Sequence, residues 1–211
     1  MFISDNITRK SNLEESDSIS SYMGFSCQQN PYCFEEFYKL LESIKPSRIL
    51  EIGTSLGGLT SYLKHVATEI GLSTVVRSYD IYELNWYNEL RDNDNVDIRV
   101  ENIFEDNYSK LTDTEIIDFI QSDGITLILC DGGNKIEEFN LLSNYMKSSD
   151  VIMAHDYAYN PDFFESEINK KYWNWHEISE SDIAEAVERN NLSSFMQEGF
   201  TKAVWVCKNK Q

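Results

Sequence analysis

The chain has 211 residues, which corresponds to about one domain at the usual ~150 residues per domain. It carries 36 Asp and Glu against 18 Lys and Arg, a formal net charge of −18. Such a surplus of negative charge repels phosphate backbones and anionic lipid surfaces. Composition therefore argues against a nucleic-acid or membrane partner.

Neither the first residues of the chain nor its cysteines suggest export. No run approaches the ~20 apolar residues that span a bilayer, and residues 1–18 lack the apolar centre of a secretion signal. Cys27, Cys33, Cys130 and Cys207 form no C-x-x-C pair, which favours free thiols in a reducing compartment. We expect a cytoplasmic protein; its oligomeric state stays open, a homo-oligomer included.

The first part of the chain differs in composition from the rest. Residues 1–30 are rich in Ser, Asn and acidic residues and poor in apolar ones, which predicts a polar N-terminal arm that packs late or over a ligand. A single compact domain is expected over residues 31–211. Its first helix is predicted from Asn30 and Pro31, a typical helix start, and it ends at Pro46.

From there on, short apolar runs alternate with amphipathic ones, as in parallel α/β folds. Buried strands are expected at Arg48–Ile52, Thr74–Tyr79, Val96–Val100, Ile125–Cys130 and Val151–Ala154. Helices are expected near Gly58–Ile70, Glu83–Arg91, Thr112–Gln121, Asn134–Met146 and Asp182–Asn190. The tail predicts an antiparallel hairpin of Ser194–Gln197 and Lys202–Lys208 around a turn at residues 198–201.

A glycine-containing turn follows the first of these strands. Glu51 and Gly53 end the strand, and Gly57 and Gly58 begin the next helix; ligands of open α/β sheets bind at this end of the strands. The turn is not a phosphate loop, because no Lys follows the glycine pair. It is not a dinucleotide fingerprint either, because the spacing is G-x-x-x-G-G with a bulky Leu56 before the pair.

Two acidic residues near this turn call for partners. Burying the Glu51 carboxylate costs several kcal/mol, on the order of an ion's effective burial penalty, unless it meets a cation or donors. A ligand ammonium is one such partner, and backbone amides of a tight turn are the alternative. Asp80 ends the second strand about 20 residues beyond Gly58, the offset at which an acid reaches a ribose hydroxyl. The alternative for Asp80 is to cap a turn.

Together, Glu51-x-Gly53-x-x-x-Gly57-Gly58, the acid after the second strand and the terminal hairpin resemble the class I S-adenosyl-L-methionine (AdoMet)-dependent methyltransferases. The resemblance implies a Rossmann-like, doubly wound α/β fold with a seven-stranded, mostly parallel sheet and a C-terminal antiparallel hairpin. It implies AdoMet as cofactor. The implied cofactor-binding residues are Glu51, Gly53, Thr54, Gly57 and Gly58 for methionine, Asp80 and Ile81 for ribose, and Asn102 and Ile103 for adenine.

Polar residues also follow the fourth and fifth strands. Asp131 ends one, and His155 and Asp156 end the next; neighbouring parallel strand ends lie roughly 5 Å apart, so these side chains can converge. Two carboxylates and an imidazole suit a divalent cation. A metal-free polar pocket is the alternative, as is a structural role in which Asp131 caps the helix near Asn134 and Asp156 orients His155.

This half of the chain resembles the metal-dependent small-molecule O-methyltransferases and the cephalosporin-hydroxylase-like group. The resemblance implies Mg²⁺ or Mn²⁺ on Asp131 and Asp156. The sequence departs from the group at His155, where the group usually has an acid or a different neighbour, and at Asn134, where some members carry a catalytic His or Lys. Lys135, one residue later, is then a candidate for that role.

The expected function is AdoMet-dependent methylation of a small-molecule acceptor, with O-methylation favoured. Asp131, His155 and Lys135 are the predicted catalytic residues. Either a bound cation lowers the pKa of the acceptor hydroxyl, or His155 or Lys135 takes its proton, and His155 is expected as the base or as a third metal ligand. Two alternatives stay open. One is an AdoMet- or nucleoside-binding protein that does not methylate, and the other is a cephalosporin-hydroxylase-like enzyme. An aromatic-rich stretch over residues 157–175 is expected to form either a wall of the substrate pocket or part of the core.

Overall fold

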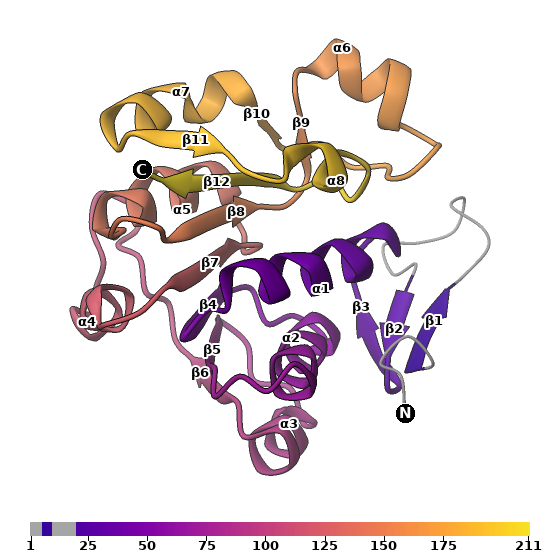
Figure 1. Ribbon diagram of the computed structural model, residues 1–211, viewed down its shortest axis with the longest axis vertical. Coiled ribbons are helices and arrows are strands. Elements are labelled where there is room, and N and C mark those ends of the chain that lie inside the picture. Colours follow the sequence, from indigo (N-terminus) through magenta and orange to yellow (C-terminus); the bar gives the residue numbers. More distant parts are fainter. Residues whose placement is uncertain (1–5, 10–19) are drawn as a thin grey trace.

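In the computed structural model, which describes residues 6–9 and 20–211, the centre of the fold is a seven-stranded sheet (Figure 1). Its strands follow the order β11-β12-β8-β7-β4-β5-β6. Five of them run parallel: β4 (Arg48–Ile52), β5 (Val75–Asp80), β6 (Asp97–Val100), β7 (Thr126–Cys130) and β8 (Val151–Ala154). The two last strands, β12 (Val206–Lys210) and β11 (Leu192–Ser194), are antiparallel to their neighbours.

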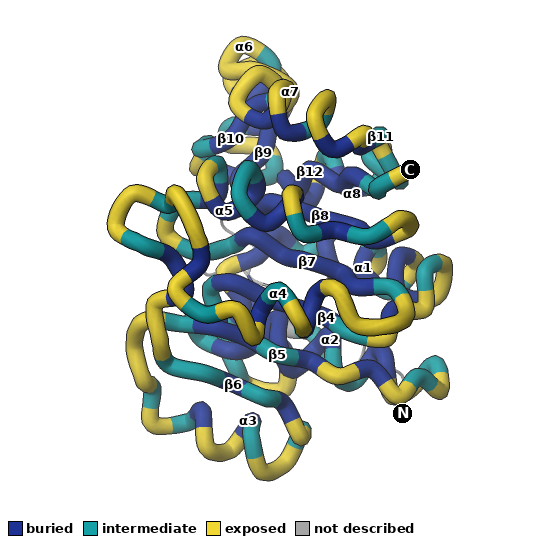
Figure 2. Tube along the Cα trace, turned by 90° about the vertical axis from the view of Figure 1, so that its left-hand side faces the viewer, coloured by how far each residue is buried: buried dark blue, intermediate teal, exposed yellow. Residues whose placement is uncertain are grey.

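The five predicted parallel strands are confirmed, each within one residue at either end. Their apolar residues are buried on both faces of the sheet, as the continuous runs indicate. Every residue of β7 is buried, and on β4 Ile49 and Leu50 pack into different core clusters. Figure 2 shows β7 and β8 as dark blue strands in the interior, with exposed segments at the periphery.

Helices cover both faces of this sheet, giving three layers. One core cluster holds the apolar sides of α1 (Tyr32–Ile44), α2 (Gly58–Glu69) and α3 (Tyr87–Asp94). The other holds those of α4 (Glu115–Gln121), α5 (Lys135–Leu142) and α7 (Glu180–Arg189). A short 3-10 turn, η2 (Ser143–Tyr145), extends α5. The predicted helices are present; α3 and α4 begin a few residues later than the pattern indicates.

The C-terminal antiparallel pair is confirmed, but its predicted turn and strand bounds are wrong, since the strands lie at Leu192–Ser194 and Val206–Lys210. Residues expected in the turn form helix α8 (Gln197–Lys202), which separates β11 from β12. The cause is burial: Phe200 is fully buried, and its ring lies 5.3 Å from that of Phe37 on α1. Trp205 packs against the same Phe37 ring at 5.4 Å. An exposed turn would leave Phe200 in water.

Part of the predicted arm packs on the domain. Strands β1 (Ile7–Arg9), β2 (Ser20–Tyr22) and β3 (Phe25–Cys27) form a small antiparallel sheet beside α2. Tyr22 and Cys27 are buried in the core of α1, α2 and α3. Residues 1–5 and 10–19 of the predicted arm lie outside the described residues, and the boundary at residue 31 stays a prediction.

The aromatic-rich stretch after β8 forms a separate lobe. Strand β9 (Tyr157–Ala158) pairs in parallel with β10 (Ile178–Ser179), and α6 (Pro161–Phe163) and the π-helix η3 (Phe164–Ile168) lie between them. A small third core cluster includes Phe164 and Trp173. No helix in the described ranges is long and apolar enough to cross a membrane. The four cysteines are buried free thiols, as predicted.

Candidate functional site

Two adjoining cavities lie at the carboxyl ends of the parallel strands, one of about 380 Å³ and one of about 430 Å³. They share the strand ends of β4 and β7, between which the strand order changes direction, and this switch point is where open α/β sheets bind ligands. The residues lining both are Gly53, Ser55, Leu56, Asp131 and Gly132.

The predicted site residues all line one or both cavities. Those of the first cavity are Glu51, Gly53, Thr54, Gly57, Gly58, Asp131, Lys135, His155 and Asp156. Those of the second are Gly53, Asp80, Ile81, Asn102, Ile103 and Asp131. The methionine, acceptor and metal predictions therefore gather at the first cavity, and the ribose and adenine predictions at the second.

Gly53 is required by the close approach of two strand ends. Its φ is +92°, a region that side chains rarely adopt. A Cβ added here would lie 2.2 Å from the main-chain oxygen of Asp131. The glycine thus lets β4 and β7 meet at the junction of the two cavities.

The glycine pair is explained by packing inside the protein. Gly57 has φ +78°, and a Cβ there would lie 2.4 Å from Cδ1 of Leu90 on α3. A Cβ on Gly58 would lie 2.3 Å from Sγ of Cys27 and 2.6 Å from the main-chain oxygen of Ser26. Gly58 therefore accommodates β3, which brings the N-terminal segment to the edge of the first cavity.

Glu51 lies at the glycine turn and is 1% exposed. Its Oε2 accepts hydrogen bonds from the hydroxyls of Thr60 and Ser78, each at 2.5 Å. The Ser78 hydroxyl also lies 2.6 Å from that of Thr54. Burial raises the pKa of the Glu51 carboxyl to about 7, against the lowering effect of the two hydroxyls. A ligand ammonium placed here would be a partner of opposite charge for the Glu51 carboxylate.

Asp80 connects the glycine turn to the end of β5. Its Oδ2 accepts from the Ser55 amide at 2.7 Å and from the Tyr87 hydroxyl at 3.3 Å, and its Oδ1 accepts from the Tyr82 amide at 3.1 Å. The turn-capping alternative is thus realised, while the same carboxylate lines the second cavity. Its ribose role stays a prediction.

The second cavity has apolar walls, and the sequence predicted only some of the residues that form them. Ile103 is buried, while Ile81 is 59% exposed, and Asn102 caps its own loop by accepting from the Phe104 amide at 3.0 Å. Phe104 and Tyr108 also line the cavity, with ring centres 4.9 Å apart. These aromatic residues had no motif to reveal them.

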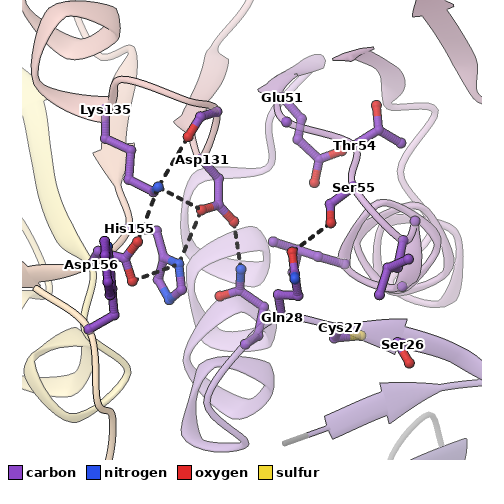
Figure 3. A pocket seen from close by; sticks show the side chains of 18 of the residues that line it. Ser26, Cys27, Gln28, Glu51, Thr54, Ser55, Asp131, Lys135, His155 and Asp156 are labelled. Carbon is purple, nitrogen blue, oxygen red and sulfur yellow. Dashed lines mark hydrogen bonds and ion pairs between the residues drawn. The ribbon is translucent and has the colours of Figure 1, made fainter. Parts of the chain in front are cut away.

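His155 and Asp131 form a hydrogen-bonded pair in the first cavity (Figure 3). Nδ1 of His155 lies 3.1 Å from Oδ1 of Asp131 and 3.6 Å from Oδ1 of Asp156. Nε2 is buried and has no hydrogen-bond partner within the described residues. Burial alone would lower the pKa of the imidazole, but the carboxylates of Asp131 and Asp156 outweigh it and raise the pKa.

Lys135 points into the same group of carboxylates. Its Nζ lies 3.1 Å from Oδ2 of Asp156, 3.1 Å from Oε2 of Glu177 and 4.0 Å from Oδ1 of Asp131. Burial opposes the charge, yet these carboxylates raise the pKa of Lys135 above its usual value. An ammonium held in this way is a poor proton acceptor. The assignment of a base to His155 or Lys135 stays a prediction.

The predicted metal ligands already have partners. Oδ2 of Asp131 accepts from Nε2 of Gln29 at 2.6 Å, and Oδ1 of Asp156 accepts from Nε1 of Trp173 at 2.7 Å. Within residues 6–9 and 20–211, no group of three or more His, Cys, Asp or Glu side chains is arranged to hold a metal ion. With the Lys135 ammonium beside Asp156, the donor set does not fit a divalent cation.

Three polar residues at the site were not predicted from the sequence. Gln29 contacts Asp131, and its Oε1 accepts from Nε1 of Trp205 at 2.9 Å. Gln28 accepts from the Ser55 hydroxyl at 2.7 Å. Glu177 pairs with Lys135 from a loop near β10. These residues come from segments without a motif, and only the position of the glutamines just before the first helix hints at a role.

Comparison with known proteins gives likeness at the level of structure. No family model and no curated protein sequence matches the chain. The apo structure of CmcI superposes with a TM-score of 0.64 at 13% identity, covering 95% of this chain and 80% of that one. CmcI with Mg and SAM superposes at 0.61 and 14% identity, over 94% and 81%. An O-methyltransferase family protein from Burkholderia thailandensis superposes at 0.52 and 8% identity, over 85% and 55%.

The chain shares its fold with CmcI and with the O-methyltransferase family protein. The prediction of a Rossmann-like, doubly wound α/β fold with a mostly parallel seven-stranded sheet is confirmed. In this methyltransferase fold, β4 carries the glycine turn, β5 carries Asp80, and β7 and β8 carry Asp131 and His155.

Proposed function

We propose that the chain is an AdoMet-dependent methyltransferase that methylates a hydroxyl group of a small-molecule acceptor. The observation that carries the proposal is the pair of adjoining cavities, which together are lined by all of the predicted cofactor residues and by the His155–Asp131 pair. The shared fold and the neighbour solved with SAM support it.

The residues present fit AdoMet. The buried Glu51 carboxylate would receive the ammonium of the methionine portion, and the glycine turn at Gly53 and Thr54 would lie along its chain. Asp80 would accept from the ribose, and Asn102 and Ile103 would flank adenine. When bound, AdoMet supplies an electrophilic methyl group on a sulfonium. The chain's own residues orient the acceptor and exclude water, which lowers the barrier by proximity.

His155 would take the acceptor proton. A hydroxyl is a weak nucleophile, so a positioned base assists the transfer. With Nδ1–H donating to Asp131, the lone pair of His155 lies on Nε2, the atom that lacks a partner in the described residues. Asp131 is then a positioning residue that holds the tautomer and stabilises the imidazolium. The proposed transfer uses no metal ion, since the donor set does not fit one.

The acceptor would lie against the aromatic lobe. Trp173 and Trp175 line the first cavity, and Trp175 is 64% exposed, so its ring offers an apolar face at the cavity edge. This arrangement and the overall negative charge favour a neutral or cationic small molecule with an apolar portion.

The test is transfer of labelled methyl from AdoMet to a panel of phenolic, sugar and alcohol acceptors, with EDTA present. We expect methylated product from at least one acceptor, and equal rates with EDTA and with added Mg²⁺. AdoMet binding without transfer to any acceptor would instead favour the non-methylating alternative. Transfer that EDTA abolishes would overturn the metal-free mechanism.

A further inference from the structure

The ammonium of Lys135 lies between the carboxylates of Asp156 and Glu177, where a metal ion would have to lie to contact both. Nζ has partners at 3.1 Å in three directions: Oδ2 of Asp156, Oε2 of Glu177 and the main-chain oxygen of Gly132. An ammonium has three hydrogens to donate. All three therefore have acceptors inside the protein, and none remains for a substrate.

The lysine is held at this point by the start of helix α5. Asn134 caps the helix through its Oδ1, which accepts from the Glu137 amide at 3.3 Å. The main-chain amide of Lys135 donates to Oε1 of Glu177 at 2.9 Å, so one carboxylate holds both ends of the residue. The Lys135 side chain is only 10% exposed. Figure 3 shows Lys135 directed toward Asp131 and Asp156.

We propose that the Lys135 ammonium is the resident cation of the acceptor site, holding Asp156 and Glu177 in place of a divalent metal ion. A divalent ion needs oxygen ligands at about 2.0–2.6 Å, and it reaches Asp156 only by displacing the ammonium. Lys135 is thus a positioning residue. Its consequence for transfer rests on the proposed function, but its effect on metal binding does not.

Removing the ammonium exposes the oxygen atoms that it now contacts. Lys135→Ala leaves oxygens of Asp156, Glu177 and Gly132 around one small space, with Asp131 nearby. Hard oxygen donors of this kind suit Mg²⁺ and Mn²⁺. We therefore expect the variant to gain a metal site that the unaltered chain lacks.

The experiment titrates Mn²⁺ into the full chain and into Lys135→Ala, followed by calorimetry and by the melting temperature. The matched control is Lys147→Ala, which removes a lysine paired with Asp150 at 2.9 Å at the opposite end of the sheet. We expect saturable Mn²⁺ binding, at least about tenfold tighter than in the unaltered chain, in Lys135→Ala alone. Lys135→Arg, which keeps the charge, should exclude Mn²⁺ like the unaltered chain.

Mn²⁺ binding by the unaltered chain as tight as that of Lys135→Ala, or a folded Lys135→Ala that binds no Mn²⁺, would overturn the proposal. If Lys135→Ala melts below room temperature without metal, Mn²⁺ should restore its melting transition, and failure to do so also counts against the proposal. These readouts need no methyl transfer. A chain that shows the expected Mn²⁺ behaviour but methylates nothing would refute the proposed function alone.

Discussion

Glu51 is the residue whose charge state should control cofactor binding. With its pKa raised to about 7 by burial, its carboxyl is mostly protonated at pH 6 and mostly ionised at pH 7.5. The ionised form is the one that attracts an ammonium, so AdoMet affinity should increase about tenfold over this interval. Calorimetric titrations at both pH values measure it.

The matched variant is Glu51→Gln, which keeps the shape and removes the charge. Its AdoMet affinity should be weaker and should vary little between pH 6 and 7.5. An unaltered chain whose affinity is the same at both pH values, or a Glu51→Gln variant that binds as tightly as the unaltered chain, would separate Glu51 from the cofactor ammonium.

His155 should matter for transfer and little for cofactor binding. His155→Ala removes the proposed base, for which the expected loss in kcat is about 10²–10⁴-fold, with AdoMet affinity nearly unchanged. The control is His65→Ala, which removes a histidine that pairs with Asp94 at 2.9 Å outside the cavities. Equal losses in the two variants would contradict a catalytic role.

Among single residues, the sequence revealed those whose charge is unusual for the strand in which they lie or which they end. Glu51 stands out as an acid in a buried strand, and Asp131 and Asp156 as acids at strand ends. Glu177 and Gln29 lie in loops of ordinary polar composition. Their roles come from long-range packing, which brings residues far apart in sequence to Lys135 and Asp131 and leaves no local pattern.

The packing of strand β3 on helix α2 depends on Gly58. In Gly58→Ala, the added methyl group would overlap Cys27 and the main chain of Ser26. We expect the free energy of unfolding in urea to fall by about 1–3 kcal/mol, the usual cost of overpacking, and hydrogen exchange to increase over β3.

Gly133→Ala is the matched control, because a Cβ there meets nothing within 4 Å. Its free energy of unfolding should stay within about 0.5 kcal/mol of the unaltered chain. If both variants are equally stable, β3 does not pack on Gly58 as described.

Elements with strong local patterns were predicted well, and elements built by tertiary contacts were not. The five parallel strands are continuous apolar runs, which a sequence displays directly. Strands β2 and β3 are only three residues long each and are held by a few buried residues, chiefly Tyr22 and Cys27. Helix α8 has a turn-like sequence, and the burial of Phe200 against α1 decides its conformation.

For the whole molecule, two buried carboxyl groups make stability depend on pH. Burial raises the pKa values of Glu51 and Glu138 from 4.5 to about 7. Between these values the folded chain binds more protons than the unfolded chain, so the free energy of unfolding falls as pH rises. Each group contributes a slope of at most about 1.4 kcal/mol per pH unit.

Urea titrations at pH 5 and pH 7 test this dependence. Glu138→Gln should lose less stability over this interval than the unaltered chain, because its amide does not ionise. The comparison of slopes removes the background repulsion of the −18 net charge, which changes little between the two proteins. A variant with the same slope as the unaltered chain would show that Glu138 does not titrate in this range.

The two cavities should form one AdoMet site with its methionine end at Glu51. A crystal structure with S-adenosylhomocysteine tests it most directly. We predict density across the junction at Gly53 and Asp131, with the amino group at Glu51 and the ribose at Asp80. Density in the reverse orientation, or binding only outside these cavities, would rule out this AdoMet site.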